Sequence, residues 1–140
     1  MTKSFASASL YVIGDHLLPD DVTAMLGLAP TNVYKKGALK VPGRSDSAKY
    51  PTTMWIRSES SETSSASVLF EDILRSIPHG ICIRDIDGVD DAFVDVFFAQ
   101  AVPETDLNRA IDFEIEFHKA KLLAALGLST KISFCNVSDQ

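Results

Sequence analysis

Apolar and polar residues alternate along this chain with two periods, and each period predicts one kind of element. Over residues 69–77 the apolar residues recur every three or four positions, which predicts a helix with one buried face. Over residues 111–117 they recur every second position, which predicts a strand. The two faces of that strand would carry the apolar Ile111, Phe113, Ile115 and Phe117 and the acidic Asp112, Glu114 and Glu116. We expect the apolar face to line the core and the acidic face to meet solvent or a partner.

Proline and glycine mark the ends of two further short helices. Pro19 opens the first, which we expect over residues 19–27, and Gly27 ends it in the left-handed conformation. The second covers residues 119–126 and ends in the same way at Gly127. β-Branched and aromatic residues predict the remaining strands, at 5–13, 33–36, 52–57, 81–84, 92–101 and 130–137.

The predicted order of elements is β-α-β-β-α-β-β-β-α-β. Helices separated by runs of strands indicate the α+β class with antiparallel strands. We therefore expect a single two-layer domain over residues 1–140, with a largely antiparallel sheet and two to three short helices on one face. Residues 37–51, which hold two glycines, two prolines and two serines, predict a mobile loop. Both short helices end in Leu-Gly-Leu, which leaves internal duplication open beside the alternative of a common helix ending.

The formal net charge of −6 is unevenly distributed. Residues 1–57 hold seven Lys and Arg against four Asp and Glu, while residues 58–140 hold six against fifteen. An acidic protein repels nucleic-acid phosphates, so a nucleic-acid partner is disfavoured and a basic protein partner would be attracted.

Other composition signals bear on location. No apolar run is long enough to span a bilayer, and the N-terminal stretch lacks the continuous apolar block of a signal peptide. We therefore expect a cytoplasmic protein without membrane contact. Cys82 and Cys135 lie in strand-like segments, where we expect two buried, reduced thiols.

The sequence predicts no catalytic residue, no metal site and no cofactor. The acidic run at residues 85–95 lacks the glycine and the glutamate that an EF-hand loop needs at its sixth and twelfth positions. The three histidines are far apart, whereas zinc ligands cluster. No serine lies in a Gly-x-Ser-x-Gly turn.

One segment offers an arguable binding site. Residues 34–50 hold five cations and two tyrosines, opposed only by Asp46. Basic residues interleaved with aromatic ones can bind phosphate or stack on bases. A solvated loop held extended by its charges is the alternative. A binding site would need a concave pocket, and its candidate residues are Tyr34, Lys35, Lys36, Lys40, Arg44 and Trp55.

The turn and cap residues resemble those of a family of small bacterial proteins known as domain of unknown function 4279. The resemblance spans about residues 5–135 and implies an architecture, because the family brings no established activity. The matching residues are Gly14-Asp15, Leu18-Pro19-Asp20, Leu26-Gly27-Leu28, Pro30-Thr31, Lys36-Gly37, Trp55 and Leu126-Gly127-Leu128.

Two functional hypotheses from different classes lead, and an enzyme is the third. The first is a non-enzymatic cytoplasmic domain that binds a basic protein, as an immunity or antitoxin-type partner would, through Asp112, Glu114 and Glu116. This hypothesis rests on analogy with other small acidic bacterial domains. The alternative is a domain that binds a small ligand or anion through the basic loop at residues 34–50.

Overall fold

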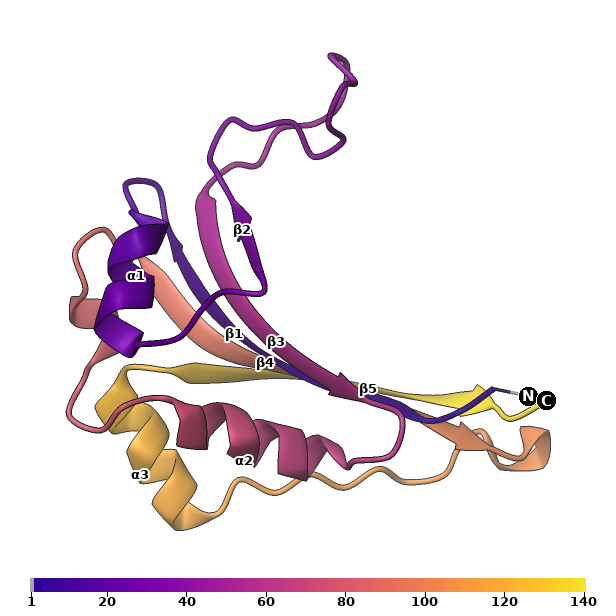
Figure 1. Ribbon diagram of the computed structural model, residues 1–140. Coiled ribbons are helices and arrows are strands. Elements are labelled where there is room, and N and C mark those ends of the chain that lie inside the picture. The colour runs from indigo at the N-terminus through magenta and orange to yellow at the C-terminus, as the bar shows by residue number, and fades with distance from the viewer. Residues whose placement is uncertain (1) are drawn as a thin grey trace.

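A computed structural model describes residues 2–140 as one open sheet with helices on one face (Figure 1). Two 3₁₀ turns lie at Ile83–Asp85 and Glu104–Asp106. The strands and α-helices are β1 (Phe5–Gly14), α1 (Pro19–Leu26), β2 (Asn32–Tyr34), β3 (Thr53–Ser61), α2 (Ala66–Ser76), β4 (Asp91–Val102), α3 (Phe117–Leu126) and β5 (Ser129–Ser138). The α+β class and the largely antiparallel sheet are confirmed.

The strand order is β2-β3-β1-β4-β5. All neighbouring pairs are antiparallel except β4 and β5, which are parallel. The elements from β1 to β4 follow the split β-α-β order of ferredoxin-like domains, and α3 with β5 extends it. β3 separates β1 from β2, whereas β5 lies directly beside β4. The two helices that end in Leu-Gly-Leu thus belong to different crossovers, and the topology gives internal duplication no support.

The core lies between the sheet and the helices. Every second side chain of β1, from Ala6 to Val12, is completely buried. These side chains form one cluster with the apolar stripe predicted for α2, which includes Phe70 and Ile73. On the same face Trp55 of β3 is fully buried, and its indole N–H donates to the Thr23 hydroxyl of α1 over 3.0 Å. Burying apolar side chains of this size contributes about 1.5–3 kcal/mol each, so this face fixes the register of β1.

The prediction of a strand at residues 111–117 is wrong. Residues 107–116 form an irregular segment, and Phe117 begins α3 with 80% of its surface exposed. Half-buried and exposed side chains still alternate along this segment, although it is not a strand. Phe113 packs edge-on against Phe70 and contacts Phe134, while Asp112 and Glu114 are exposed. The adjacent edge of β4 is already paired with β5, and the segment lies on the core side without joining the sheet.

Three smaller expectations are corrected or confirmed. Residues 81–84 form no strand, because a 3₁₀ turn occupies Ile83–Asp85. β3 runs four residues beyond the predicted end, into the serine-rich stretch, where the Ser9 and Ser58 hydroxyls lie 2.8 Å apart. Gly27 and Gly127 end their helices with φ of 65° and 72°, as predicted.

In the part of the chain that the structure describes, no helix is long and apolar enough to cross a membrane.

Candidate functional site

The 35–52 loop, which joins β2 to β3, projects beyond the sheet as a twisted hairpin (Figure 1). Its two arms exchange backbone hydrogen bonds, from Gly37 N–H to the Tyr50 carbonyl and from Tyr50 N–H to the Ala38 carbonyl, both over 2.9 Å. Leu39 and Lys49 pair across it as an isolated bridge. These bonds align the residues just beyond β2 with those just before β3.

The base of this loop brings two tyrosines and two lysines together. The rings of Tyr34 and Tyr50 stack with centroids 4.6 Å apart, and the Lys40 ammonium lies 5.7 Å from the centre of the Tyr50 ring. They border an open cavity of about 520 Å³, here called the tyrosine cleft. Two of the residues that line it are lysines, and none is a carboxylate. The lining residues are Val33, Tyr34, Lys35, Ala38, Leu39, Lys40, Pro42 and Tyr50. Neither Lys35 nor Lys40 forms an ion pair with any residue of 2–140.

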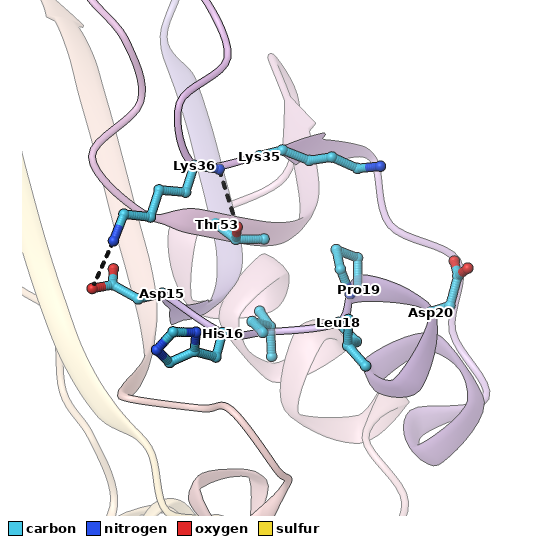
Figure 2. A pocket seen from close by; sticks show the side chains of 9 residues that line it. Asp15, His16, Leu18, Pro19, Asp20, Lys35, Lys36 and Thr53 are labelled. Carbon is cyan, nitrogen blue, oxygen red and sulfur yellow. Dashed lines mark hydrogen bonds and ion pairs between the residues drawn. The ribbon is translucent and has the colours of Figure 1, made fainter.

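Lys35 also borders a second cavity, of about 580 Å³, between the β1–α1 turn and the end of β2. Figure 2 shows Lys35 and Lys36 pointing in opposite directions from the chain. The Lys36 ammonium lies 3.2 Å from a carboxylate oxygen of Asp15, and its backbone N–H donates to the Thr53 hydroxyl over 3.1 Å. Asp20 borders the same cavity. We call this cavity the Asp15 cleft; its charges are mixed, unlike those of the tyrosine cleft.

The Asp15 carboxylate is tied to its surroundings. A hydrogen bond from Thr52, together with the ion pair and hydrogen bond from Lys36, holds the pKa of Asp15 below its usual value. The backbone N–H of Asp15 donates to the Asp90 carboxylate over 3.0 Å. Asp15 is therefore ionised at neutral pH and compensates Lys36, so Lys36 is not a free cation for a ligand.

The face of the sheet opposite the helices carries a row of aromatic residues that leads to the tyrosine cleft. Tyr11 of β1 stacks on Phe93 of β4 with centroids 4.9 Å apart. The Lys131 ammonium of β5 lies 3.9 Å from the centre of the Phe93 ring. Burial, followed by the nearby charges of Asp95 and Tyr34, raises the pKa of Tyr11. Tyr11 is therefore a neutral hydroxyl near the foot of the cleft.

The structure brings together three of the six candidate ligand-binding residues, namely Tyr34, Lys35 and Lys40. Lys36 belongs to the Asp15 cleft, and Arg44 lies at the loop tip, 3.4 Å from an Asp46 carboxylate oxygen. Trp55 is fully buried on the helix side of the sheet and lines neither cleft. Its strand position opposite Val33 places it on the other face from Tyr34, because successive side chains of a strand alternate.

Tyr50 completes the tyrosine cleft, although sequence reasoning did not include it among the binding residues. Tyr50 is one of the two aromatic residues of the loop, but its proximity to Tyr34 depends on the pairing of the two loop arms. No local pattern encodes that pairing. The pairing could only have been inferred by treating the loop as a hairpin and aligning its ends.

The three acidic candidates share no strand face. Asp112 and Glu114 are exposed and make no ion pair within residues 2–140. Glu116 lies 3.7 Å from the Lys119 ammonium and 3.4 Å from His118 Nδ1. Lys119 therefore partly compensates Glu116, while Asp112 and Glu114 remain uncompensated.

The sequence of the chain matches one known family. Residues 3–135 match the family described as Domain of unknown function (DUF4279). The chain belongs to this family. No curated protein and no solved structure matches it. Membership confirms the resemblance seen in the turn and cap residues, and it assigns no chemistry to either cleft. Among residues 2–140, no three His, Cys, Asp or Glu side chains are grouped to hold a metal ion.

Proposed function

We propose that this protein is a non-enzymatic binding domain whose tyrosine cleft takes a small anionic ligand. The observation that supports the proposal is the lining itself, which combines two lysines without ion pairs, two tyrosines and no carboxylate. A cavity of about 520 Å³ falls in the range typical of small-molecule sites. A phosphate or carboxylate group in this cleft would meet a lining that carries two cations, Lys35 and Lys40, with the tyrosine rings beside them.

The expected affinity is modest. Ion pairs at exposed sites contribute about 0.2–1 kcal/mol each, and both lysines are exposed. The stacked rings hold the Lys40 arm of the loop in place, which reduces the ordering cost of binding. Two such ion pairs support only weak binding, and a dissociation constant of about 1 mM corresponds to about −4 kcal/mol. Binding should weaken as salt is added.

The experiment measures binding of three probes by calorimetry: inorganic phosphate, adenosine monophosphate and adenosine. We expect the two anions to bind and the neutral nucleoside to bind more weakly or not at all. Lys35→Ala and Lys40→Ala should each weaken anion binding about twofold to fivefold, the equivalent of one exposed ion pair. Lys121→Ala is the matched control, because Lys121 also lies over an aromatic ring, 5.6 Å from the centre of Phe117, but borders no such cleft.

Two results would contradict the proposal. One is the absence of binding by both anions at low salt. The other is binding that Lys121→Ala weakens as much as Lys35→Ala and Lys40→Ala do, because such binding would reflect overall charge.

A second function, binding of a basic protein as an immunity or antitoxin-type partner does, is favoured by exposed Asp112 and Glu114. Uncompensated carboxylates on an acidic chain speed association with a basic surface. Against the expectation of two buried thiols, Cys82 is half-buried and Cys135 is exposed. Both are unpaired, which supports a reducing bacterial cytoplasm as the place of action.

The test of this second function is a pull-down from the native host at low and high salt. It compares the wild type with a variant in which Asp112, Glu114 and Glu116 are all changed to Ser. Loss of a basic partner by the folded variant supports the function, and retention of every partner contradicts it.

A further inference from the structure

The two edges of the sheet differ in length and in protection. At one edge β2 has only three residues and continues into the projecting 35–52 loop. At the other edge β5 has ten residues, all of them in register with β4. Within residues 2–140, the backbone of β5 makes no hydrogen bond on the side away from β4. An unpaired row of this length is a template for a further strand.

β5 also lacks the features by which edge strands avoid pairing. It contains no proline, and its register with β4 runs without a bulge from Ser129 to Ser138. Its one charged residue is Lys131, and the ammonium lies over the Phe93 ring on the open face of the sheet, not along the edge. Ile132 is 42% exposed on this edge strand. Nothing in the strand therefore opposes the approach of another strand.

We propose that β5 pairs antiparallel with β5 of a second copy of this chain, about a two-fold axis near Ile132. β5 holds one lysine and no carboxylate, so two copies of this edge meet without facing carboxylates, although each chain has a net charge of −6. With the axis at Ile132, Lys131 lies opposite the partner's Ser133, and no two lysines face each other. The exposed surface of Ile132 is then covered by its own copy. The result is one continuous sheet across two chains.

The 107–116 segment limits how much of β5 can pair with a second copy. The side-chain amide of Asn136 donates to the carbonyls of Leu107 and Arg109, over 2.9 and 2.6 Å. This segment lies beside the C-terminal part of β5. Pairing about Ile132 uses mainly residues 129–135 and leaves that contact intact.

Sedimentation equilibrium of the full chain, from micromolar to submillimolar concentration, tests the proposal. We expect the mass to rise with concentration toward twice that of one 15.2 kDa chain. Ile132→Lys and Ser133→Lys each place a new charge beside the axis and should keep the chain monomeric over the same range. Val68→Lys is the matched control, because Val68 is 47% exposed on α2, away from the edge, and it should dimerise like the wild type. Circular dichroism shows whether each variant is folded.

Amide hydrogen exchange gives a second readout that needs no variant. The outward-pointing amides among residues 129–135 should exchange more slowly at high than at low protein concentration. A wild type that stays monomeric over this concentration range would overturn the proposal. So would a monomer whose β5 edge instead pairs with an extended peptide of another protein. A dimer that both lysine variants leave intact, or that Val68→Lys also abolishes, would overturn it as well.

Discussion

The aromatic ring of Tyr34 stacks on that of Tyr50 with centroids 4.6 Å apart and planes inclined by 21°. Residues 35–49 of the 35–52 loop lie between these two tyrosines in sequence, so the stack closes the loop at its base. Aromatic pairs of this kind contribute about 0.5–1.5 kcal/mol beyond the area they bury. The stack therefore fixes the loop arm that carries Lys40, and the tyrosine cleft depends on it.

Removing one ring should loosen the loop without unfolding the domain. Tyr50→Ala is expected to reduce the free energy of unfolding by about 1 kcal/mol. It should also speed amide exchange at Gly37 and Lys40, whose N–H groups donate to the Tyr50 and Ala48 carbonyls. Tyr50→Phe keeps the ring and should leave exchange unchanged. Equal exchange in the wild type and in Tyr50→Ala would contradict a structural role for the stack.

Asp15 should titrate below its ordinary value of 3.8. Thr52→Val removes the largest cause of this shift and Lys36→Ala the next, so each should raise the pKa of Asp15. A lowered pKa in the folded state stabilises the fold above pH 3.8, and this contribution is lost as the pH falls through the folded pKa. Carboxyl chemical shifts followed by NMR against pH measure it. A pKa of Asp15 that neither variant raises would refute the assignment.

The two helix-ending glycines should respond differently to alanine. Both have positive φ, so either change costs about 1–2 kcal/mol of backbone strain. A Cβ at Gly27 would meet nothing within 4 Å, whereas at Gly127 it would lie 2.8 Å from the Cys82 sulfur. Gly127→Ala should therefore destabilise by about 1–3 kcal/mol more than Gly27→Ala.

Denaturant unfolding of the single and double variants measures this difference. Adding Cys82→Ala removes the clashing sulfur and should reduce the cost of Gly127→Ala, while it should leave the cost of Gly27→Ala unchanged. Equal costs at the two glycines would show that the Gly127 contact relaxes freely.

Phe113 in the 107–116 segment and Phe117 at the start of α3 should respond differently to alanine. Phe113→Ala should cost about 2 kcal/mol, less than the 3–5 typical of a fully buried ring, because Phe113 is half-buried against Phe70 and Phe134. Phe117→Ala should change stability by about 0.5 kcal/mol or less, because its ring is exposed. Thermal unfolding distinguishes the two. A larger loss at Phe117 would restore the original expectation that it lines the core.

Local chemistry explains which parts of the fold could be predicted from sequence. The proline that opens α1, the glycines after α1 and α3, and the apolar stripe of α2 each act within a few residues, and the three helices were predicted from them. The alternation of apolar and acidic residues at 111–117 indicates only which side chains face inward. An extended segment without sheet hydrogen bonds produces the same alternation as a strand does. Whether such a segment pairs with the edge of a sheet is not visible in a local pattern.

The candidate site was predictable only in part for the same reason. The loop composition indicated Tyr34, Lys35 and Lys40, but the pairing of loop arms that adds Tyr50 is a long-range property. Trp55 was misplaced because its strand register decides its face. Lys36 is compensated by Asp15, which lies in the turn after β1 and is distant in sequence.

The most direct test of the central claim is an NMR titration of the isotope-labelled chain with adenosine monophosphate at low salt. The anion-binding account predicts progressive amide shifts at Tyr34, Lys35, Lys40 and Tyr50, and the double change of Lys35 and Lys40 to Ala should move their midpoint to a clearly higher ligand concentration than either single change does. Lys121→Ala should leave them intact. Shifts that are absent, or that lie around Lys121 or Lys131 and keep the same midpoint in the double variant, would contradict the account.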